Sequence, residues 1–221
     1  MDLTKDKTKK AMICLNGEPP SKNMIEKHME NVDTIIAADG GVNWLMDYSI
    51  YPDLVIGDLD SAKQEHLRKV PYIHIKDQNS TDLEKALHHV IDFGVTHVDL
   101  LGIEAGRVDH FLSNFFLLLP FTEKLKLRVF GDGWIGVFLE NKSVFKIREN
   151  VTVSLIPFSP CTGVSLEGFE FPLKNQDLKL GQVGVSNVSK KNNVSIEVKE
   201  GKLLGIFYDL NLQLLEEDAL Q

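Results

Sequence analysis

The stretch "TIIAADGGVNWLMDYSIYPDLVIGDLDS", residues 34–61, places a helix-like segment between two short apolar runs. The runs at 34–39 and 53–58 are rich in Ile, Leu and Val, and the segment between them spans 41–48. The same alternation extends over residues 11–119. Strands that alternate with helices predict a parallel sheet covered by helices, so we expect an α/β, Rossmann-like N-terminal domain.

The clearest helix in the sequence begins within "NSTD", residues 79–82. Thr81 and Glu84 have the spacing of a capping box at its start, and Gly94 provides a stop at its end. The apolar residues recur every three or four positions, as one buried face of a helix requires: Leu83, Ala86, Leu87, Val90 and Ile91.

Beyond Pro120 the helical periodicity gives way to strand-like runs separated by Gly, Asn and Pro. The expected strands lie at 126–131, 134–140, 143–147, 151–158, 163–169, 193–201 and 203–210. We predict two domains, an α/β domain at 1–130 and an all-β, sandwich-like domain at 131–221. The string "GDGWIG" at 131–136 fits a dinucleotide-binding pattern, but the strand-like run after it favours a turn at Asp132 and Gly133.

The composition is that of a globular chain, because 43% of its 221 residues are apolar and can form a full core. A net charge of −8 argues against nucleic acid as a partner and favours small cations or metal-bound anions. Cys14 and Cys161 suggest neither a disulfide framework nor a thiolate metal site, which fits a reducing cytoplasm. We expect no membrane span, since no apolar stretch approaches about 20 residues, and no signal peptide.

Charged residues follow several of the predicted parallel strands. They are Asp39, Asp58, Asp60, Asp77 and Asp82, and the run at 97–102 is followed by Arg107, Asp109 and His110. Ligands of open α/β sheets bind beyond the carboxyl ends of the strands. We therefore expect these side chains to converge at one edge of the sheet.

Asp58 and Asp60 are two positions apart, which in an extended segment points both carboxylates the same way. With Asp82 they offer the oxygen ligands that Mg²⁺ prefers, and we predict that these three bind the metal. The alternative is a solvated acidic turn or helix cap for the pair, and for Asp82 a first-turn acid that complements the helix dipole.

Bound phosphates would need donors other than a Walker loop, because the sequence contains none. Gly40 and Gly41 permit close approach of the backbone, so the amides after them can meet a phosphate, although a simple strand-to-helix turn also explains them. Lys85 and Arg107 supply positive charge. A plain capped helix start does not need Arg107, so we predict a phosphate contact there.

Four short motifs, "AADGG", "VIGDLDS", "DQNSTDLEKAL" and "GRVDHFLSN", occur in this order ahead of the β-rich half. In this combination the chain resembles the thiamine pyrophosphokinase family over nearly its whole length, and "GVSN" is similar to part of that family's thiamine-binding domain. The resemblance implies an enzyme that transfers the terminal pyrophosphate of ATP to the hydroxyethyl group of thiamine, giving thiamine diphosphate and AMP with Mg²⁺. It also implies a homodimer with sites between the subunits.

The resemblance implies roles for individual residues as well. Asp39, Asp58, Asp60 and Asp82 would organise Mg²⁺ and the triphosphate, Arg107, Asp109 and His110 would line the same cleft, and Ser186 and Asn187 would contact thiamine. Other residues expected to contact ATP are Gly40, Gly41, Ser61, Gln78, Ser80, Thr81 and Lys85. The family's aromatic residue that stacks on the pyrimidine is expected where this chain has Leu204 and Gly205, and Phe207 is the candidate to replace it.

A primary alcohol is a poor nucleophile at neutral pH, so we expect Asp60 or Asp82 to accept its proton. Two other functions stay open at this point. A metal-dependent phosphohydrolase or phosphoryl transferase acting on another small molecule would use the same aspartates and would release phosphate or ADP. A non-catalytic module that binds thiamine or a nucleotide would show binding without turnover.

Overall fold

The computed structural model describes residues 9–104, 107–182 and 184–208. The chain folds into two compact units, the first ending at Asp132 and the second beginning at Gly133. These two residues form the predicted turn, in which Gly133 has a φ of +76° that a side chain would disfavour. Within the described ranges, no helix is long and apolar enough to cross a bilayer.

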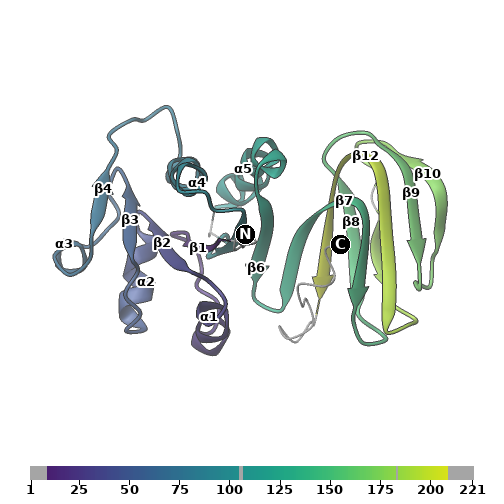
Figure 1. Cartoon of the computed structure of the whole chain (residues 1–221), viewed down its shortest axis with the longest axis horizontal. Helices are drawn as coiled ribbons and strands as arrows, with labels where there is room; N and C mark the ends of the chain where they lie inside the picture. The colour runs from purple at the N-terminus through teal and green to yellow at the C-terminus, as the bar shows by residue number, and fades with distance from the viewer. Residues whose placement is uncertain (1–8, 105–106, 183, 209–221) are drawn as a thin grey trace, which may run out of the picture. The chain divides into compact units, whose positions relative to one another are not determined.

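The first unit alternates strands and helices in the predicted way (Figure 1). Its elements are β1 (Lys10–Cys14), α1 (Lys22–Met29), β2 (Thr34–Ala38), α2 (Gly41–Asp47), β3 (Leu54–Gly57), α3 (Gln64–Leu67), β4 (Tyr72–His74), α4 (Asp82–Asp92), β5 (His97–Leu101), α5 (Val108–Leu118), the 3-10 helix η1 (Leu119–Glu123) and β6 (Lys126–Gly131).

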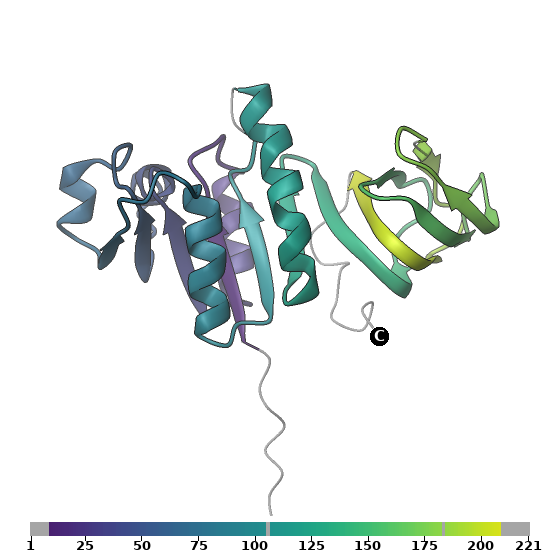
Figure 2. The ribbon, with the colours of Figure 1, turned by 90° about the horizontal axis from the view of Figure 1, so that it is seen from above.

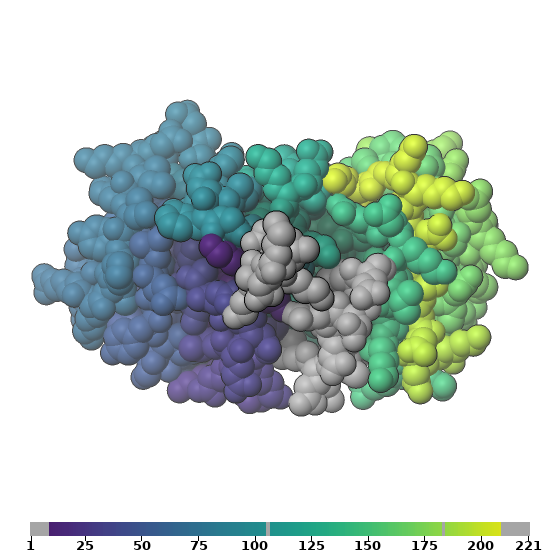
Figure 3. All heavy atoms as spheres, in the orientation of Figure 1, coloured from purple at the N-terminus to yellow at the C-terminus, as the bar shows by residue number. Residues whose placement is uncertain are grey.

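Parallel strands form the sheet of the first unit in the order β6-β5-β1-β2-β3-β4. The runs at 11–14 and 35–38 are buried along their length, as expected for strands that are covered on both faces. Figure 1 shows α4 and α5 on one face and α1 and α2 on the other, and Figure 2 confirms that α4 and α5 lie side by side. Side chains fill the spaces between these ribbons on the face in Figure 3. The order of the strands reverses between β1 and β5, and ligands of open α/β sheets bind beyond the carboxyl ends of the strands.

Helix α4 is capped as the sequence predicts. The Thr81 hydroxyl accepts a hydrogen bond from the Glu84 amide at 3.2 Å, and Gly94 ends the helix with a φ of +74°. The predicted buried face needs one correction: Ile91 is only half-buried, while Lys85 is buried. The spacing of apolar residues could not predict the burial of Lys85, because its ammonium is buried in an ion pair with Asp82.

The second unit contains strands throughout its described part. They are β7 (Trp134–Lys146), β8 (Thr152–Pro157), β9 (Cys161–Glu167), β10 (Leu173–Leu178), β11 (Gly184–Val188) and β12 (Asn193–Tyr208). In the described residues these strands pair antiparallel with one another.

Four strands that we expected as separate elements in this unit form only two strands, so that part of the prediction is wrong. The runs at 134–140 and 143–147 belong to the single strand β7, and those at 193–201 and 203–210 belong to β12 as far as the described residues reach. A register shift between Val198 and Leu203 bends β12, so the intervening polar residues mark a bulge and not a strand end. Strands β10 and β11 were missed because they are largely exposed and polar, without apolar alternation.

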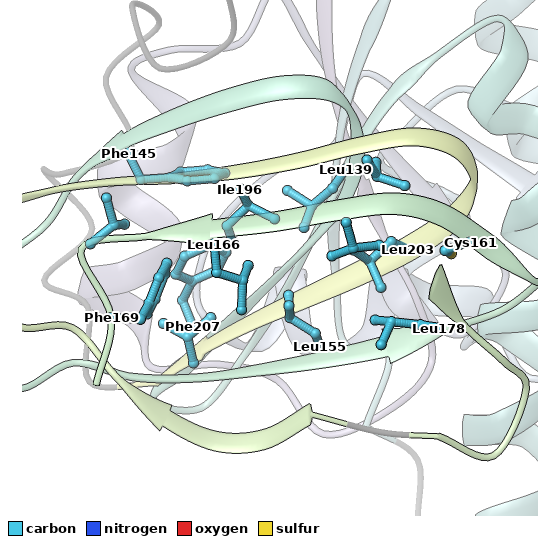
Figure 4. Packing of buried hydrophobic residues seen from close by; sticks show 14 of the residues in the cluster. Leu139, Phe145, Leu155, Cys161, Leu166, Phe169, Leu178, Ile196, Leu203 and Phe207 are labelled. Atoms are coloured by element: carbon cyan, nitrogen blue, oxygen red, sulfur yellow. The ribbon is translucent and has the colours of Figure 1, made fainter. Parts of the chain in front are cut away.

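The core of the second unit is apolar (Figure 4). Phe145 from β7 and Phe207 from β12 pack with ring centroids 4.7 Å apart, and both are almost fully buried. Leu155, Leu166 and Phe169 lie around them in the same cluster. Because aromatic side chains bury large apolar areas, this cluster is the main source of stability that the unit has by itself.

Candidate active site

Three aspartates converge at the carboxyl ends of β2 and β3. Asp39 directly follows β2, Asp58 directly follows β3, and Asp82 is the first residue of α4. One carboxylate oxygen from each lies within 4.8 Å of the other two. The predicted convergence of acids at this edge is therefore present for these three residues.

Gly57 makes this convergence possible. A Cβ atom at this position would lie 2.8 Å from the Asp39 Cβ and 2.9 Å from the Asp82 Oδ1. Any side chain there would push two of the three carboxylates apart. The last residue of β3 must therefore be glycine if the cluster is to form.

Asp39 is the most buried member, with 4% of its surface exposed. Burial raises the pKa of its carboxyl, and the charge of Asp82 adds to this rise, against hydrogen bonds from Ser61 and Gly40 that favour the ionised form. The Ser61 amide donates to Oδ2 at 3.2 Å, while Oδ1 has no hydrogen-bond partner within the described residues. A buried carboxylate oxygen that receives no hydrogen bond can coordinate a cation instead.

Asp58 is held in its ionised form. The Gln78 amide donates to Oδ2 at 2.9 Å and lowers the pKa of Asp58, and the Asp60 backbone amide contributes in the same direction. Gln78, predicted to contact ATP, thus contacts the Asp58 carboxylate in this structure.

Asp82 pairs with Lys85 one helical turn later. The Lys85 ammonium donates to Asp82 Oδ1 at 3.0 Å, and 4% of the Lys85 side chain is exposed. This ion pair explains the burial of a lysine on the inner face of α4. The ammonium lies at the cluster, where it can also meet an anionic ligand.

The cluster retains an excess of negative charge. Three ionised carboxylates and one ammonium leave two formal negative charges. Two full charges 4.8 Å apart repel by about 3 kcal/mol at an effective dielectric constant of about 20. Carboxylate oxygens gathered in this way suit a hard divalent cation, which would remove the repulsion and satisfy Asp39 Oδ1. Asp39, Asp58 and Asp82 therefore fit Mg²⁺.

Asp60 does not share this cluster. Leu59 adopts a left-handed conformation with a φ of +62°, so the alternation of an extended strand does not apply between Asp58 and Asp60. Asp60 is exposed, and its Oδ1 accepts from the Ser61 hydroxyl at 2.9 Å. The cluster therefore joins Asp39 to Asp58 and Asp82, and the predicted metal contact of Asp60 stays a prediction.

The turn ahead of α4 is organised by Asp77. Its carboxylate accepts from the Asn79 amide and from the Ser80 hydroxyl, the latter at 2.8 Å. The Thr81 side chain caps α4 as described above. Ser80 and Thr81 therefore fix the backbone that leads into Asp82, and their predicted contacts with ATP stay predictions.

Arg107 and its neighbours lie at the start of α5. The Arg107 guanidinium donates two hydrogen bonds to Asp109, at 3.1 and 2.6 Å, and lowers the pKa of that carboxyl to about 2. Both side chains and His110 are exposed. Ala105 and Gly106 of the same motif lie outside the described residues. The hydrogen bonds of Arg107 and Asp109 described here stay within the motif, so the phosphate role of Arg107 stays a prediction.

The predicted thiamine contacts lie in the second unit. Ser186 is exposed and has a left-handed φ of +59°. Asn187 is buried, and its side chain forms hydrogen bonds with both backbone polar groups of Phe171, which gives it a structural role. Phe207 is fully buried in the core, so its ring cannot stack on a ligand in this structure, and the proposed replacement is wrong.

A cavity of about 360 Å³ lies at the other end of the first sheet. Its lining includes the first residues of β1, β2 and β3, namely Lys10, Thr34 and Leu54, together with the end of α4. None of the predicted site residues lines it. Catalysis is better assigned to the carboxyl ends of the strands, where the charged groups gather.

Family models match each unit separately. The model described as "Thiamin pyrophosphokinase, catalytic domain" matches residues 25–130, within the first unit. The model described as "Thiamin pyrophosphokinase, vitamin B1 binding domain" matches residues 142–203, within the second. The chain belongs to the thiamin pyrophosphokinase family.

Two relatives in the thiamin pyrophosphokinase family show how far the similarity extends. The thiamine pyrophosphokinase of Bacillus subtilis is 31% identical over 156 residues, which are 66% of this chain and 73% of the relative. Thiamin pyrophosphokinase 1 of Caenorhabditis elegans is 28% identical, and the match covers 99% of this chain and 97% of the relative.

Solved structures of thiamin pyrophosphokinases share the fold. The crystal structure of the Bacillus subtilis enzyme has a TM-score of 0.82 at 24% identity, and the match covers 91% of this chain and 100% of that chain. For the enzyme of Geobacillus thermodenitrificans the TM-score is 0.78 at 21% identity, with 92% and 99% coverage. At these identities the structures support the mixed α/β fold with a strand-rich C-terminal unit.

Two polar residues beside the cluster were not singled out in the sequence. Asn43 on α2 and His66 on α3 contact each other, with Asn43 Oδ1 and His66 Nδ1 at 3.2 Å. The available signal was weak. Asn43 is a polar residue directly before the apolar Trp44 and Leu45, and it closely follows "AADGG".

Proposed function

We propose that this chain is a thiamine diphosphokinase, which transfers the terminal pyrophosphate of ATP to the hydroxyethyl group of thiamine and releases AMP. The observation that carries this proposal is the cluster of Asp39, Asp58 and Asp82 in a unit matched by the family's catalytic domain. The match of the second unit to a vitamin B1 binding domain favours thiamine as acceptor over another small molecule.

The two units have different tasks in this proposal. The first, a Rossmann-like sheet, holds ATP and the metal at the carboxyl ends of its strands. The second, a sandwich-like unit, binds thiamine. Support for this division comes from the family matches, since each covers one unit.

Asp39, Asp58 and Asp82 would hold Mg²⁺. Bound there, the ion supplies positive charge that neutralises phosphate oxygens as pyrophosphate moves from one oxygen to another. Lys85 and Arg107 are the side chains that orient the phosphates, because both carry donors that suit phosphate oxygens. Holding the two substrates in line accounts for much of the rate in reactions of this class.

Asp60 is the group that we assign to the proton of the thiamine hydroxyl. Asp82 is engaged by Lys85 and shares the three-carboxylate cluster, whereas Asp60 is exposed and outside it. A carboxylate within hydrogen-bond reach of the hydroxyl can accept its proton as the oxygen attacks the β-phosphorus.

We also propose that the enzyme acts as a homodimer in the cytoplasm. Both statements are supported by resemblance to the family. Sedimentation at several protein concentrations would test the first, since a monomer at micromolar concentration would contradict it.

The proposed function is tested by identifying the nucleotide product. The purified chain is incubated with ATP, Mg²⁺ and thiamine, and the products are separated by chromatography and assigned by ³¹P NMR. The expected result is AMP and thiamine diphosphate in equal amounts, with neither formed when thiamine or Mg²⁺ is omitted. Release of ADP or phosphate independent of thiamine would contradict the proposal and support a phosphohydrolase.

A further inference from the structure

Asn43 connects α2 to the chain that leaves the acidic cluster. Its Nδ2 donates to the Ser61 carbonyl oxygen at 2.9 Å, and its Oδ1 accepts from the Lys63 amide at 2.9 Å. The Nδ1 atom of His66 lies 3.2 Å from the same Oδ1. One half-buried carboxamide is thus bonded at three points to residues 61–66.

These contacts fix the orientation of the carboxamide and the tautomer of the histidine. The Lys63 amide can only donate, so the atom facing it is Oδ1, and the Ser61 carbonyl can only accept, so the atom facing it is Nδ2. His66 must then carry its proton on Nδ1 to bond with Oδ1. His66 is 7% exposed, so solvent offers little replacement for this bond.

Ser61 links Asn43 to the cluster. The N–H of Ser61 donates to Asp39 Oδ2 at 3.2 Å, and its C=O accepts from Asn43. Asn43 therefore acts on Asp39 through one residue. Asp58 begins the same 58–63 segment, and Leu59 within it has a left-handed φ of +62°. A bulky residue keeps such a conformation only where its surroundings hold it, so the segment needs anchors on both sides of Leu59.

We propose that Asn43 is a positioning residue of the metal site: by holding Ser61, it keeps the 58–63 segment where Asp39 and Asp58 can bind a divalent cation together. This inference rests on the proposed function for its biological meaning, but not for its test. Asn43 touches neither phosphate nor metal in this role. Residues that orient metal-binding carboxylates typically change metal affinity about 10-fold to 100-fold when they are replaced.

A purely structural role for Asn43 makes a different prediction. Lys63 precedes α3 and His66 belongs to it, so Asn43 Oδ1 also anchors this short helix. Asn43→Asp separates the two roles. The aspartate keeps an oxygen for Lys63 and His66 but places a second oxygen against the Ser61 carbonyl, where a donor is needed. Its added negative charge would by itself attract a cation, so weaker cation binding cannot come from charge.

The experiment measures cation binding directly and apart from turnover. Mn²⁺ is titrated into the full-length wild-type chain, Asn43→Leu and Asn43→Asp, and free Mn²⁺ is followed by electron paramagnetic resonance. The Mg²⁺ concentration for half-maximal AMP formation is measured in parallel, with the KM for thiamine as an internal comparison. Asp53→Ala is the matched control, because Asp53 accepts from the Ile35 amide at the opposite end of the same sheet.

We expect both Asn43 variants to bind Mn²⁺ about 10-fold or more weakly than the wild type, with little change in the KM for thiamine. Asp53→Ala should lower the unfolding temperature without changing the Mn²⁺ affinity. Wild-type Mn²⁺ affinity in Asn43→Asp would overturn the inference, as would an equal loss of affinity in Asp53→Ala. If the wild type binds Mn²⁺ but forms no AMP, the proposed function fails, and the Mn²⁺ titrations still decide the role of Asn43.

Discussion

The first unit contains two groups of buried or half-buried charged residues, and the protein balances their charges differently. Asp99 on β5 receives two hydrogen bonds from Arg128 on β6, both at 2.7 Å, and one contact from His28 on α1 at 3.2 Å. The cluster of Asp39, Asp58 and Asp82 has an ion pair between Lys85 and Asp82. One carboxylate meets two basic side chains in the first group, whereas three carboxylates share one ammonium in the second.

This difference separates a structural group from a site. Burial raises the pKa of Asp99, but hydrogen bonds and charge from His28 and Arg128 outweigh it, so the net pKa is lowered. Asp39 lacks such compensation and its pKa is raised. A buried carboxylate that the protein neutralises contributes to folding, and a group of carboxylates that it leaves charged is suited to a ligand.

The largest effect on turnover should follow from removing one negative charge from the cluster of Asp39, Asp58 and Asp82. Asp58→Asn is expected to lower the rate of AMP formation about 1000-fold, because it removes a cation ligand while keeping the size of the side chain. Circular dichroism should show an unchanged fold. Asp92→Asn, at the exposed end of α4, is the matched control and should retain wild-type activity. Comparable turnover in the two variants would refute the metal assignment.

Removing the charge of Asp99, which Arg128 and His28 balance, should lower the stability of the fold and leave the turnover rate unchanged. Asp99→Asn is expected to lower the free energy of unfolding by about 3 kcal/mol, because Arg128 and His28 lose their carboxylate. Since folding lowers the pKa of Asp99, this stability is present above its ordinary pKa of 3.8 and is lost as the pH falls through the lower folded value.

Urea unfolding of wild type and Asp99→Asn at pH 7 and near pH 2.5 would measure the difference. The gap between them should be full at pH 7 and smaller at acid pH. If Asp99→Asn folds with wild-type stability but no longer turns over substrate, the Asp99 group is not purely structural and the contrast with the aspartate cluster fails.

A divalent cation should stabilise the protein through the uncompensated cluster. Mg²⁺ at 100 times its dissociation constant is expected to add about 2.7 kcal/mol to the free energy of unfolding, and Asp39→Asn should remove most of this gain.

Because the folded-state pKa of Asp39 is raised, the metal-free protein loses stability as the pH rises through that pKa. At pH 7 the metal-free Asp39→Asn variant should therefore be at least as stable as the wild type. Thermal unfolding with and without Mg²⁺ measures both effects, and equal Mg²⁺ stabilisation of the two proteins would contradict the assignment.

The smallest effect is expected at the exposed pair of Arg107 and Asp109. Arg107→Ala should leave the unfolding temperature nearly unchanged, because exposed ion pairs contribute little to stability. It should raise the pKa of Asp109 from about 2 towards the usual 3.8, which NMR titration of the carboxyl resonance can follow. An Asp109 pKa that does not move would show that Arg107 does not hold this carboxylate in solution.

Local sequence signals predicted most of the first unit. Thr81, Glu84 and Gly94 predicted the ends of α4, since caps depend on residues within one turn. Strand β10 gave no such signal because its four central residues are exposed. It is held in place by pairing with β9, a contact that the sequence pattern does not contain.

The candidate site divides in the same way. The positions of Asp58 and Asp82 after strand β3 and at the start of α4 follow from the alternation of strands and helices. The strand pattern did not predict that Asp39 joins Asp58 and Asp82, although the family resemblance included it, because this meeting depends on the space that Gly57 leaves between Asp39 and Asp82.

The sequence by itself determined the order of the elements, the family resemblance and the residue types gathered at the strand ends, because these depend on neighbours along the chain. Only the tertiary structure decided which three carboxylates meet, that Lys85 is buried against Asp82, and that Asn43 holds Ser61. The meeting of the carboxylates and the Asn43–Ser61 contact join residues far apart in the sequence, and the burial of Lys85 depends on how α4 packs on the sheet, none of which a pattern of residue types specifies.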